Sequence, residues 1–305
     1  MNITVFGGSG FLGSHVADAL TKRGHNVLIF DKKKSPYLQK NQKMVMGDVL
    51  DETAIKKAVA DADVVYNFIA LADIDEALQK PKETVQINVL GNVNILEAIR
   101  DTNVKRFIFS SSIYVYSDSG LFYRSSKQAC ELLIENYSKA FGLEYTILRY
   151  GSLYGPRSDE RNWIYRMLKQ ALLEQKIIRE GDGEEIREYI HVHDAARLSV
   201  DILVEEYKNR CVIVTGIEQL KMKDLLRMVK EMLKNNVEIQ FASAKHKEHY
   251  EITPYVFNPQ MASKIRSNEH VDLGQGILNL LNEIHDQHVA LKPSDVKVKT
   301  AGQLS

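Results

Sequence analysis

Ser112, Tyr123 and Lys127 combine three side chains that together can move a proton, and they lie in one hydroxyl-rich stretch, residues 110–127. Tyr123 and Lys127 are four positions apart, so a helix there would place both side chains on one face. A free tyrosine, with a pKa of about 10, is a poor base at neutral pH, but an ammonium group beside it favours the phenolate. The spacing predicts that Tyr123 acts as acid and base, while Ser112 orients the same substrate oxygen.

Two further tyrosines, Tyr114 and Tyr116, alternate in the segment SIYVYS, and an extended backbone would point both to the same side. Neither is followed by a lysine one helical turn later. Aromatic side chains with polar tips commonly line clefts or pack beside them, and we expect that role for this pair. Tyr123 is therefore the predicted acid–base residue.

Short apolar runs alternate with amphipathic segments through the first half of the chain. The amphipathic segments carry apolar residues three and four positions apart, which is typical of helices. The apolar runs are nearly continuous, as expected of strands that helices cover on both faces. This alternation predicts an α/β fold with a doubly wound parallel sheet, the Rossmann arrangement. The predicted strands are NITVFGG, HNVLIFD, KMVMGDV, ADVVYNFIA, KRFIFSSS and LEYTILRYG.

A glycine-rich segment, FGGSGFLGSH, lies between the first predicted strand and the first predicted helix. Gly7, Gly10 and Gly13 would let the backbone turn tightly and approach a pyrophosphate, which the positive end of the helix attracts. Asp31 ends the second strand, where a carboxylate accepts hydrogen bonds from ribose hydroxyls and repels a 2′-phosphate. This context predicts NAD as the cofactor. The lysines at 32–34 could tolerate the phosphate of NADP, although we interpret them as a solvated turn.

After about residue 151 the rhythm changes, and turn-rich segments separate amphipathic helices. We expect a second, smaller α+β lobe that binds the substrate. One later strand, RCVIVTG, is expected to rejoin the large sheet. The predicted NAD-binding domain comprises residues 1–150 and about 186–215, and the second lobe comprises about 151–185 and 216–289. Residues 290–305 are polar and aperiodic, and a flexible tail is expected there.

Composition excludes several classes of partner. The 305 residues include 40 basic and 40 acidic side chains, so the net charge attracts neither nucleic acid nor an anionic membrane surface. Cys130 and Cys211 have no CxxC or metal-site spacing and fit a reducing compartment. No signal peptide and no apolar run of the roughly 20 residues that a membrane helix needs is evident. A cytoplasmic location is expected.

Eight segments in this order resemble the extended short-chain dehydrogenase/reductases, and among them the NAD-dependent nucleotide-sugar epimerase/dehydratase family. They are GGSGFLG, GDVLD, NFIALAD, INVLGNVNILEA, SSSIYVYS, YRSSK, LRYGSLYGPR and GDGEEIREYIHVHDAA. The resemblance spans nearly the whole chain. It implies that Tyr123 takes a proton from a sugar hydroxyl while the carbon gives hydride to NAD⁺, whose positive ring also favours the phenolate.

The same resemblance implies roles for individual residues. The implied catalytic set is Ser112, Tyr123 and Lys127. The implied cofactor-binding residues are Gly7, Gly10, Phe11, Leu12, Gly13, Asp31, Lys32, Asp48, Val49, Ile69, Ala70, Leu71, Asn88, Ser110, Tyr123, Lys127 and Tyr150. The implied substrate-binding residues are Ser111, Ser112, Ile113, Tyr114, Ser152 and Arg187. Arg187 would hold the diphosphate of a nucleoside-diphosphate sugar, and a homodimer is implied through helices containing residues about 84–101 and 123–140.

The chain also departs from the family pattern. Only DSGLF separates Ser117 from Tyr123, whereas family members carry a longer loop that helps to cover the sugar. Ser152 stands where asparagine is common, and Ser117 and His193 replace a usual glycine and aspartate. The Asp-Glu pair of sugar 4,6-dehydratases is missing after Ser112. The pocket is therefore expected to be more open or to be completed differently.

A nucleotide-sugar 4-epimerase is the function that these observations favour. A dehydrogenase or reductase acting at C4 stays open as an alternative, because its first half-reaction is the same. A non-catalytic NAD-binding module would not need the serine, tyrosine and lysine together. Neither the nucleotide base nor the sugar follows from the sequence.

Two remaining features are interpreted as structural. His191 and His193 could bind a metal as alternate residues of a strand, but no third ligand of suitable spacing is evident, so no metal site is expected. Trp163, the single tryptophan, is expected to pack in the second lobe or to form a wall of the cleft.

Overall fold

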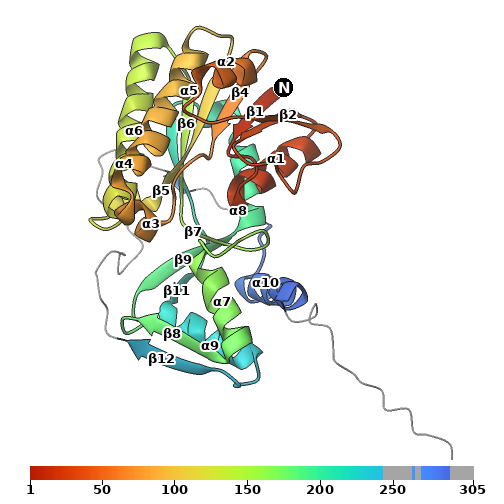
Figure 1. Cartoon of the computed structure of the whole chain (residues 1–305), viewed down its shortest axis with the longest axis vertical. Helices are drawn as coiled ribbons and strands as arrows, with labels where there is room; N and C mark the ends of the chain where they lie inside the picture. The colour runs from red at the N-terminus through yellow and green to blue at the C-terminus, as the bar shows by residue number, and fades with distance from the viewer. Residues whose placement is uncertain (243–262, 265–268, 289–305) are drawn as a thin grey trace, which may run out of the picture.

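The computed structural model of the chain describes residues 1–242, 263–264 and 269–288 (Figure 1). The predicted tail at 290–305 lies outside the described residues. One large sheet with helices on both sides forms the upper lobe in Figure 1, and small sheets with three helices form the lower lobe.

The large sheet has eight strands in the described part of the chain, and all its pairings are parallel. Its order is β13-β10-β6-β5-β4-β1-β2-β3. The order reverses between β1 and β4, which is where ligands of open α/β sheets bind, beyond the carboxyl ends of the strands. The strands are β1 (Asn2–Phe6), β2 (Asn26–Asp31), β3 (Gln42–Met46), β4 (Val64–Asn67), β5 (Arg106–Ser112), β6 (Tyr145–Tyr150), β10 (Arg210–Val214) and β13 (Ser263–Lys264).

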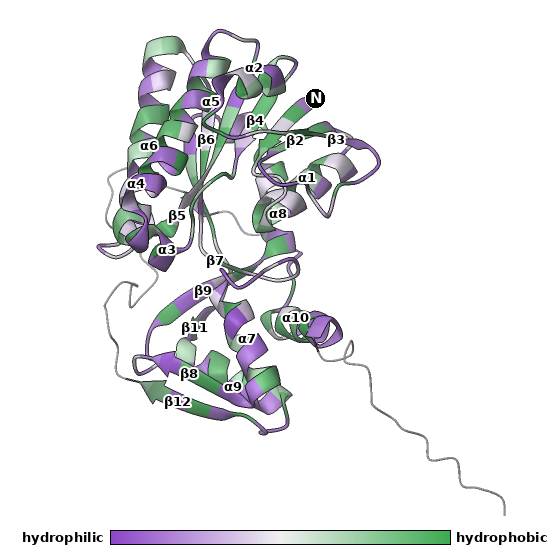
Figure 2. Cartoon of the chain, in the orientation of Figure 1, coloured by the Kyte–Doolittle hydropathy of each residue, from purple (hydrophilic) through white to green (hydrophobic). Residues whose placement is uncertain are grey.

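Helices cover both faces of this sheet and enclose two apolar cores, so the inner strands are buried on both faces. One face carries α1 (Phe11–Lys22) and α8 (Val192–Asp201), and the other carries α2 (Glu52–Val59), α5 (Gly91–Arg100) and α6 (Leu121–Phe141) (Figure 1). In Figure 2 the strands are largely hydrophobic, whereas the outer helices alternate between hydrophobic and hydrophilic residues. Three short elements join β4 to α5: α3 (Ile74–Gln79), α4 (Pro81–Thr84) and the π-helix η1 (Val85–Leu90).

The lower lobe has an apolar core of its own, to which α7, α9 and α10 each contribute. A three-stranded sheet with the order β11-β9-β7 lies closest to the large sheet, and β8 pairs with β12 farther out (Figure 1). The elements are β7 (Ser152–Tyr154), α7 (Trp163–Glu174), β8 (Lys176–Glu180), β9 (Ile186–His191), β11 (Gln219–Lys221), α9 (Met222–Met232), β12 (Glu238–Ala242) and α10 (Leu273–His288). The lobe leaves the large sheet after β6 and returns to it through α8 and β10.

The predicted fold class is confirmed: a doubly wound parallel sheet carries a smaller α+β lobe, and RCVIVTG rejoins the sheet as β10. Residues 186–191 differ from the expected arrangement, because β9 pairs with β7 and β11 and not with the large sheet. Within the described ranges, no helix is long and apolar enough to cross a membrane.

Candidate active site

The glycine-rich segment forms a tight loop at the carboxyl end of β1. Gly7 has a φ of +78°, a backbone conformation that favours glycine. A Cβ atom on Gly13 would collide with the carbonyl oxygen of Gly7, so only glycine allows the helix to begin this close to the loop. Gly10 caps α1, whose N-terminus therefore presents unpaired backbone N–H groups. This arrangement fits a bound pyrophosphate.

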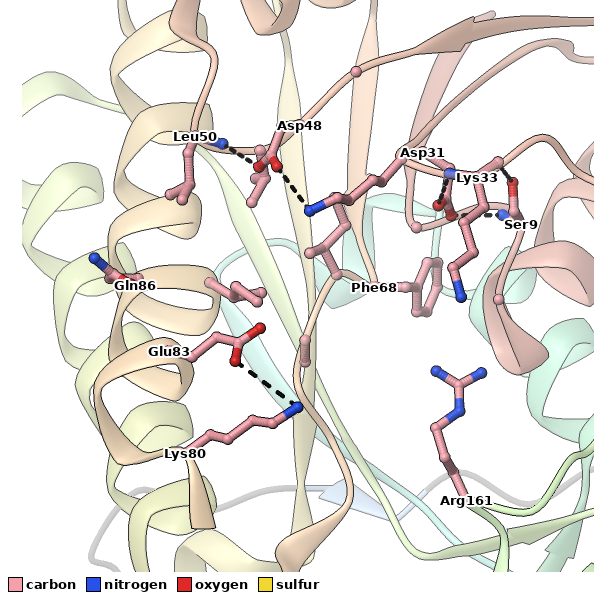
Figure 3. A pocket seen from close by; sticks show the side chains of 18 of the residues that line it. Ser9, Asp31, Lys33, Asp48, Leu50, Phe68, Lys80, Glu83, Gln86 and Arg161 are labelled. Atoms are coloured by element: carbon pink, nitrogen blue, oxygen red, sulfur yellow. Dashed lines mark hydrogen bonds and ion pairs between the residues drawn. The ribbon is translucent and has the colours of Figure 1, made fainter. Parts of the chain in front are cut away.

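A cavity of about 950 Å³ extends from this loop along the ends of β2 and β3, and we call it the glycine-loop cavity (Figure 3). Eight of the predicted cofactor residues line it: Gly7, Gly10, Asp31, Lys32, Asp48, Val49, Ile69 and Ala70. Its size and its wall of loop backbone, acidic side chains and apolar side chains fit the adenosine half of NAD.

Asp31 sits at the end of β2, as predicted. Its carboxylate accepts hydrogen bonds from the backbone N–H groups of Ser9 and Lys33, both at 3.0 Å. These hydrogen bonds join the glycine loop to β2. They also hold the Asp31 carboxylate at the place where a ribose is expected to lie. Asp48, on the far side, accepts from Leu50 N and pairs with Lys32 at 3.2 Å. The backbone hydrogen bond and then the lysine lower the pKa of Asp48.

A second cavity of about 340 Å³ adjoins the first, with Gly7, Gly10 and Ala70 in both walls, and we call it the tyrosine cavity. It collects the whole predicted catalytic set. The predicted site residues that line it are Gly7, Gly10, Phe11, Leu12, Gly13, Ala70, Leu71, Ser110, Ser111, Ser112, Tyr123, Lys127 and Tyr150.

Ser112, Tyr123 and Lys127 come together because β5 ends at Ser112 and α6 begins only nine residues later. The side chains of Ser112 and Tyr123 form a hydrogen bond. Lys127 lies one turn farther along α6, donates from Nζ to the carbonyl oxygen of Ser110 at 2.6 Å, and lies 5.7 Å from the centre of the Tyr123 ring. Ser112 and Tyr123 can therefore hold one substrate oxygen, and the Lys127 amino group lies close to the tyrosine ring.

Burial shifts the pKa values of the two titratable groups of the catalytic set, Tyr123 and Lys127. Burial raises the pKa of Tyr123 to about 12, although the hydrogen bond from Ser112 opposes this shift. Burial also lowers the pKa of Lys127 to about 8. Burial is thus the main influence on the pKa of Tyr123, and the hydrogen bond from Ser112 is the contribution that favours the phenolate.

The short segment between β5 and α6 folds differently from the expected extended strand. Residues Ile113–Tyr116 form a 3₁₀ turn, η2, so Tyr114 and Tyr116 point to different surroundings. Tyr114 lies beside the Tyr123 ring, with centroids 6.2 Å apart, whereas the hydroxyl of buried Tyr116 accepts from Arg149 Nη1. The prediction that both tyrosines face one side is wrong, because a 3₁₀ turn lacks the two-residue period of a strand.

A tight turn then leads into α6. Gly120 has a φ of +91°, and a Cβ atom there would lie 2.7 Å from Cδ1 of Tyr114. Leu121 has a φ of +40°, which is strained for a residue with a side chain. Arg124 Nη1 donates to the carbonyl oxygen of Ser117 at 2.7 Å and holds the turn. The shortened loop thus packs against Tyr114.

A third cavity, of about 220 Å³, lies between the lobes, and we call it the arginine cavity. Tyr114, Ser152 and Arg187 line it, as predicted for substrate contacts. Three more arginines line it as well: Arg161, Arg166 and Arg179. Trp163 also lines it, with the Arg179 guanidinium carbon 5.2 Å from its ring centre, so the tryptophan is a cleft wall as well as a packing residue.

Two predicted site residues line none of the three cavities. Asn88 is buried behind the wall, where its side chain accepts from Leu71 N at 2.7 Å and donates to Leu71 O at 3.1 Å. It therefore holds a cavity residue in place and does not itself line a cavity. The side chain of Ile113 packs in a small apolar cluster with Val115 and Tyr116 because η2 turns it inward, so it lines none of the three cavities.

Several lining residues were missing from the sequence-based set. Phe68 follows β4 and lines both the glycine-loop and the tyrosine cavities, and Asp73 lines the tyrosine and arginine cavities. Phe68 belongs to the strand segment NFIALAD, so the family resemblance could have indicated it. The second-lobe arginines stand in segments without a recognisable spacing, and only the fold brings them to one place.

His191 and His193, which are predicted to be structural, lie beside a third histidine, His15. The rings of His15 and His193 are 4.9 Å apart, and those of His191 and His193 are 4.8 Å apart, all in edge-on contacts. Burial lowers the pKa of both His15 and His191 to about 4. No group of three or more His, Cys, Asp or Glu residues in the described part of the chain could hold a metal ion.

Comparisons with known proteins agree with this geometry. The model of the NAD dependent epimerase/dehydratase family matches residues 3–214, which include the glycine loop, the serine strand and the Tyr123–Lys127 pair. A UDP-glucose 4-epimerase from Lactobacillus helveticus is 31% identical over 228 residues, which is 64% of this chain and 69% of that protein. A UDP-N-acetyl-alpha-D-glucosaminuronate decarboxylase from Bacillus cytotoxicus is 28% identical over 77% of this chain and 81% of its own.

Among solved structures, the UDP-glucose 4-epimerase of Thermus thermophilus in complex with NAD has the same fold. The TM-score is 0.81 at 24% sequence identity, and the alignment covers 93% of this chain and 99% of that one. The family match extends over more than half of the chain and includes every element that positions the three catalytic candidates. The chain therefore belongs to the NAD dependent epimerase/dehydratase family.

Proposed function

We propose that this protein is an NAD-dependent nucleotide-sugar 4-epimerase. The observation that carries the proposal is the meeting of Ser112, Tyr123 and Lys127 in a cavity that adjoins the glycine-loop cavity on one side and the arginine cavity on the other. A cofactor and a sugar diphosphate can thus approach the same tyrosine from opposite sides.

In the proposed reaction, Tyr123 removes the proton of the C4 hydroxyl while Ser112 holds the same oxygen by a hydrogen bond. NAD⁺ supplies a hydride acceptor at the sugar carbon and a positive ring that favours the tyrosine phenolate. Lys127 places its charge between Tyr123 and the end of β5 and can donate to the nicotinamide ribose. After the keto sugar turns over, Tyr123 returns the proton to the oxygen as hydride returns to the opposite face of C4.

The arginine cavity is the proposed site of the nucleoside diphosphate. Arg187 is buried in its wall, and guanidinium groups bind phosphates through paired N–H donors. A uridine nucleotide is the proposed substrate class, since the Lactobacillus helveticus relative and the Thermus thermophilus neighbour are both UDP-glucose 4-epimerases. Residues 1–150 and about 186–215 are proposed to serve the cofactor, except that β9, with Arg187, pairs with strands of the second lobe. The described residues of that lobe are proposed to serve the nucleotide sugar.

A C4 dehydrogenase or reductase is the second candidate. The turn of Ser117–Gly120 is short and packs on Tyr114, so it supplies no long cover for the sugar. A keto sugar could leave such a site before hydride returns, and net redox chemistry would result. A binding module without catalysis is less well supported, because it has no use for a buried lysine beside the tyrosine and serine.

We also propose a homodimer and a reducing compartment. Apolar side chains at least half exposed lie on the helices of the predicted interface, at Val85, Leu132 and Phe141. Sedimentation that shows only monomers at micromolar concentration would contradict the dimer. Cys130 and Cys211 are buried free thiols, as a cytoplasmic protein would have.

The test is to incubate the purified protein with UDP-, GDP-, CDP- and dTDP-sugars while recording NADH absorbance and product stereochemistry. Isomerised sugar without accumulation of NADH supports the epimerase. Stoichiometric NADH with a keto sugar supports the dehydrogenase. If no sugar turns over although NAD binds, the enzymatic proposal fails.

A further inference from the structure

Arg161 has no role in the reaction proposed above. It belongs to the segment between β7 and α7, in the second lobe, yet its side chain reaches the Rossmann sheet. Of the residues that the structure describes, Arg161 is the one that lines the glycine-loop, tyrosine and arginine cavities together. Figure 3 shows its guanidinium pointing into the glycine-loop cavity, toward Phe68 and Lys33.

The segment that carries Arg161 is fixed to the Rossmann domain. Arg157 Nη2 pairs with Asp18 of α1 at 2.7 Å, and the Arg157 guanidinium carbon lies 4.3 Å from the centre of the Tyr37 ring. The carbonyl oxygen of Pro156 lies 3.0 Å from Nε2 of His15, also on α1. The backbone segment that carries Arg161 is therefore held against α1 of the Rossmann domain.

The partner that Arg161 has in this structure is a local carboxylate. Asp159 receives hydrogen bonds from Nε at 3.1 Å and from Nη2 at 2.6 Å. Both side chains are more than half exposed, at 65% and 52%, so the pair contributes little to stability and can be exchanged for another anion. The hydrogen bond from Arg161 is the main cause that lowers the pKa of Asp159.

The surroundings favour an anion at this place. Lys33 also points its amino group into the part of the cavity that Arg161 faces, whereas Lys80 is paired with Glu76 and Glu83 (Figure 3). The loop backbone at Gly10 and the N-terminus of α1 form the adjoining wall. Cations from two separate segments, Arg161 and Lys33, thus face a space beside a helix N-terminus, which is suited to a phosphate ester.

We propose that Arg161 is a cofactor-binding residue, which leaves Asp159 and binds a cofactor phosphate from the side of the substrate lobe. The proposal rests on the assignment of NAD as the cofactor. Since Arg161 also lines the arginine cavity, it links the two ligands, and the lobe that holds the nucleotide sugar would also hold the cofactor. This link would keep the reduced cofactor bound while the sugar is a keto intermediate.

The test compares Arg161→Ala with Arg166→Ala in the full chain, freed of cofactor. Arg166 is the matched control, because it lines the arginine cavity and neither of the other two. Isothermal titration with NAD, without sugar, is expected to show an affinity about 10–100-fold weaker for Arg161→Ala, as expected for loss of a charged hydrogen bond, and less than about twofold weaker for Arg166→Ala. A titration with UDP then shows whether each variant still binds the nucleotide.

Three results bear on the proposal. Equal NAD affinity in wild type and Arg161→Ala, with UDP binding weakened, would overturn it and make Arg161 a substrate ligand. Arg161→Lys should recover part of the NAD affinity, since it restores the charge without the paired donors; recovery by glutamine to the same extent would also overturn it. Because NAD binding is measured without sugar, a chain that fails to epimerise any sugar leaves this test intact.

Discussion

Glu131 of α6 accepts a hydrogen bond from Ser111 Oγ at 2.5 Å, directly behind the catalytic residues. The same carboxylate pairs with Arg149 of β6, with Nε at 3.0 Å and Nη2 at 2.5 Å. Ser111 and Arg149 immediately precede Ser112 and Tyr150, and Glu131 is one turn beyond Lys127 on α6. The buried pair therefore joins the three elements that carry the active-site side chains.

Breaking this pair should disturb both stability and geometry. Glu131→Gln leaves the fully buried Arg149 without its counter-charge, and we expect the free energy of unfolding to fall by about 3–5 kcal/mol. The double variant Glu131→Met, Arg149→Met should lose less than the summed losses of Glu131→Met and Arg149→Met. Denaturant unfolding measures the free energy of unfolding of all four variants. Additive losses would show that the two side chains do not act as a pair.

Tyr123→Phe should remove turnover and leave cofactor binding in place. The substitution deletes the hydroxyl that moves the proton and keeps the ring beside Tyr114, so a loss of about 10²–10⁴-fold in kcat is expected. Tyr114→Phe is the matched control, with a smaller loss. If the Tyr114 variant loses as much as the Tyr123 variant, the assignment of the acid–base residue is wrong.

The contribution of Lys127 to the free energy of unfolding should be less favourable at neutral pH than at alkaline pH. Burial lowers its pKa from 10.5 to about 8, so the folded chain resists the charged form. Between these two values the unfolded chain binds more protons, and the contribution of this group to stability rises with pH. Lys127→Met should therefore raise the free energy of unfolding at pH 7 by about 1–3 kcal/mol, while it impairs turnover. Unfolding curves from pH 7 to pH 10 that are parallel for wild type and variant would contradict this account.

Asp31 should determine the choice between NAD and NADP. Its carboxylate is held by Ser9 N and Lys33 N at the place where the adenosine ribose would lie. Asp31→Asn removes the charge, and the ratio of NAD to NADP affinity should fall by about 10–100-fold. Asp48→Asn serves as the control and should weaken both cofactors to a similar extent. An unchanged ratio in Asp31→Asn would exclude this role.

Much of the candidate site could be predicted from the sequence, because its main residues belong to short continuous segments of the chain. The glycine loop and the Tyr123–Lys127 pair lie where a strand leads toward a helix, and Asp31 ends a strand, so each has a local sequence signal. The sequence predicts an extended segment at Ile113–Tyr116, and the 3₁₀ turn found there could not be predicted, because a four-residue turn has no periodic pattern.

Other features of the site depend on tertiary packing and could not be predicted from the sequence. The arginines of the second lobe, Arg161, Arg166 and Arg179, come from two separate segments, and neither segment alone indicates an anion site. The raised pKa of Tyr123 also could not be read from the sequence, because desolvation depends on what packs over the ring. His15 joins His191 and His193 only through the packing of α1 on α8.

The central claim is that hydride leaves C4 of the sugar and returns to the same carbon. The most direct test uses the nucleotide sugar that the substrate comparison identifies, labelled with deuterium at C4, and follows the isomerised product by mass spectrometry and NMR. The account predicts that the product keeps the deuterium at C4 with inverted stereochemistry, and that no reduced cofactor accumulates. Deuterium in free reduced cofactor, or loss of the label to water, would contradict it.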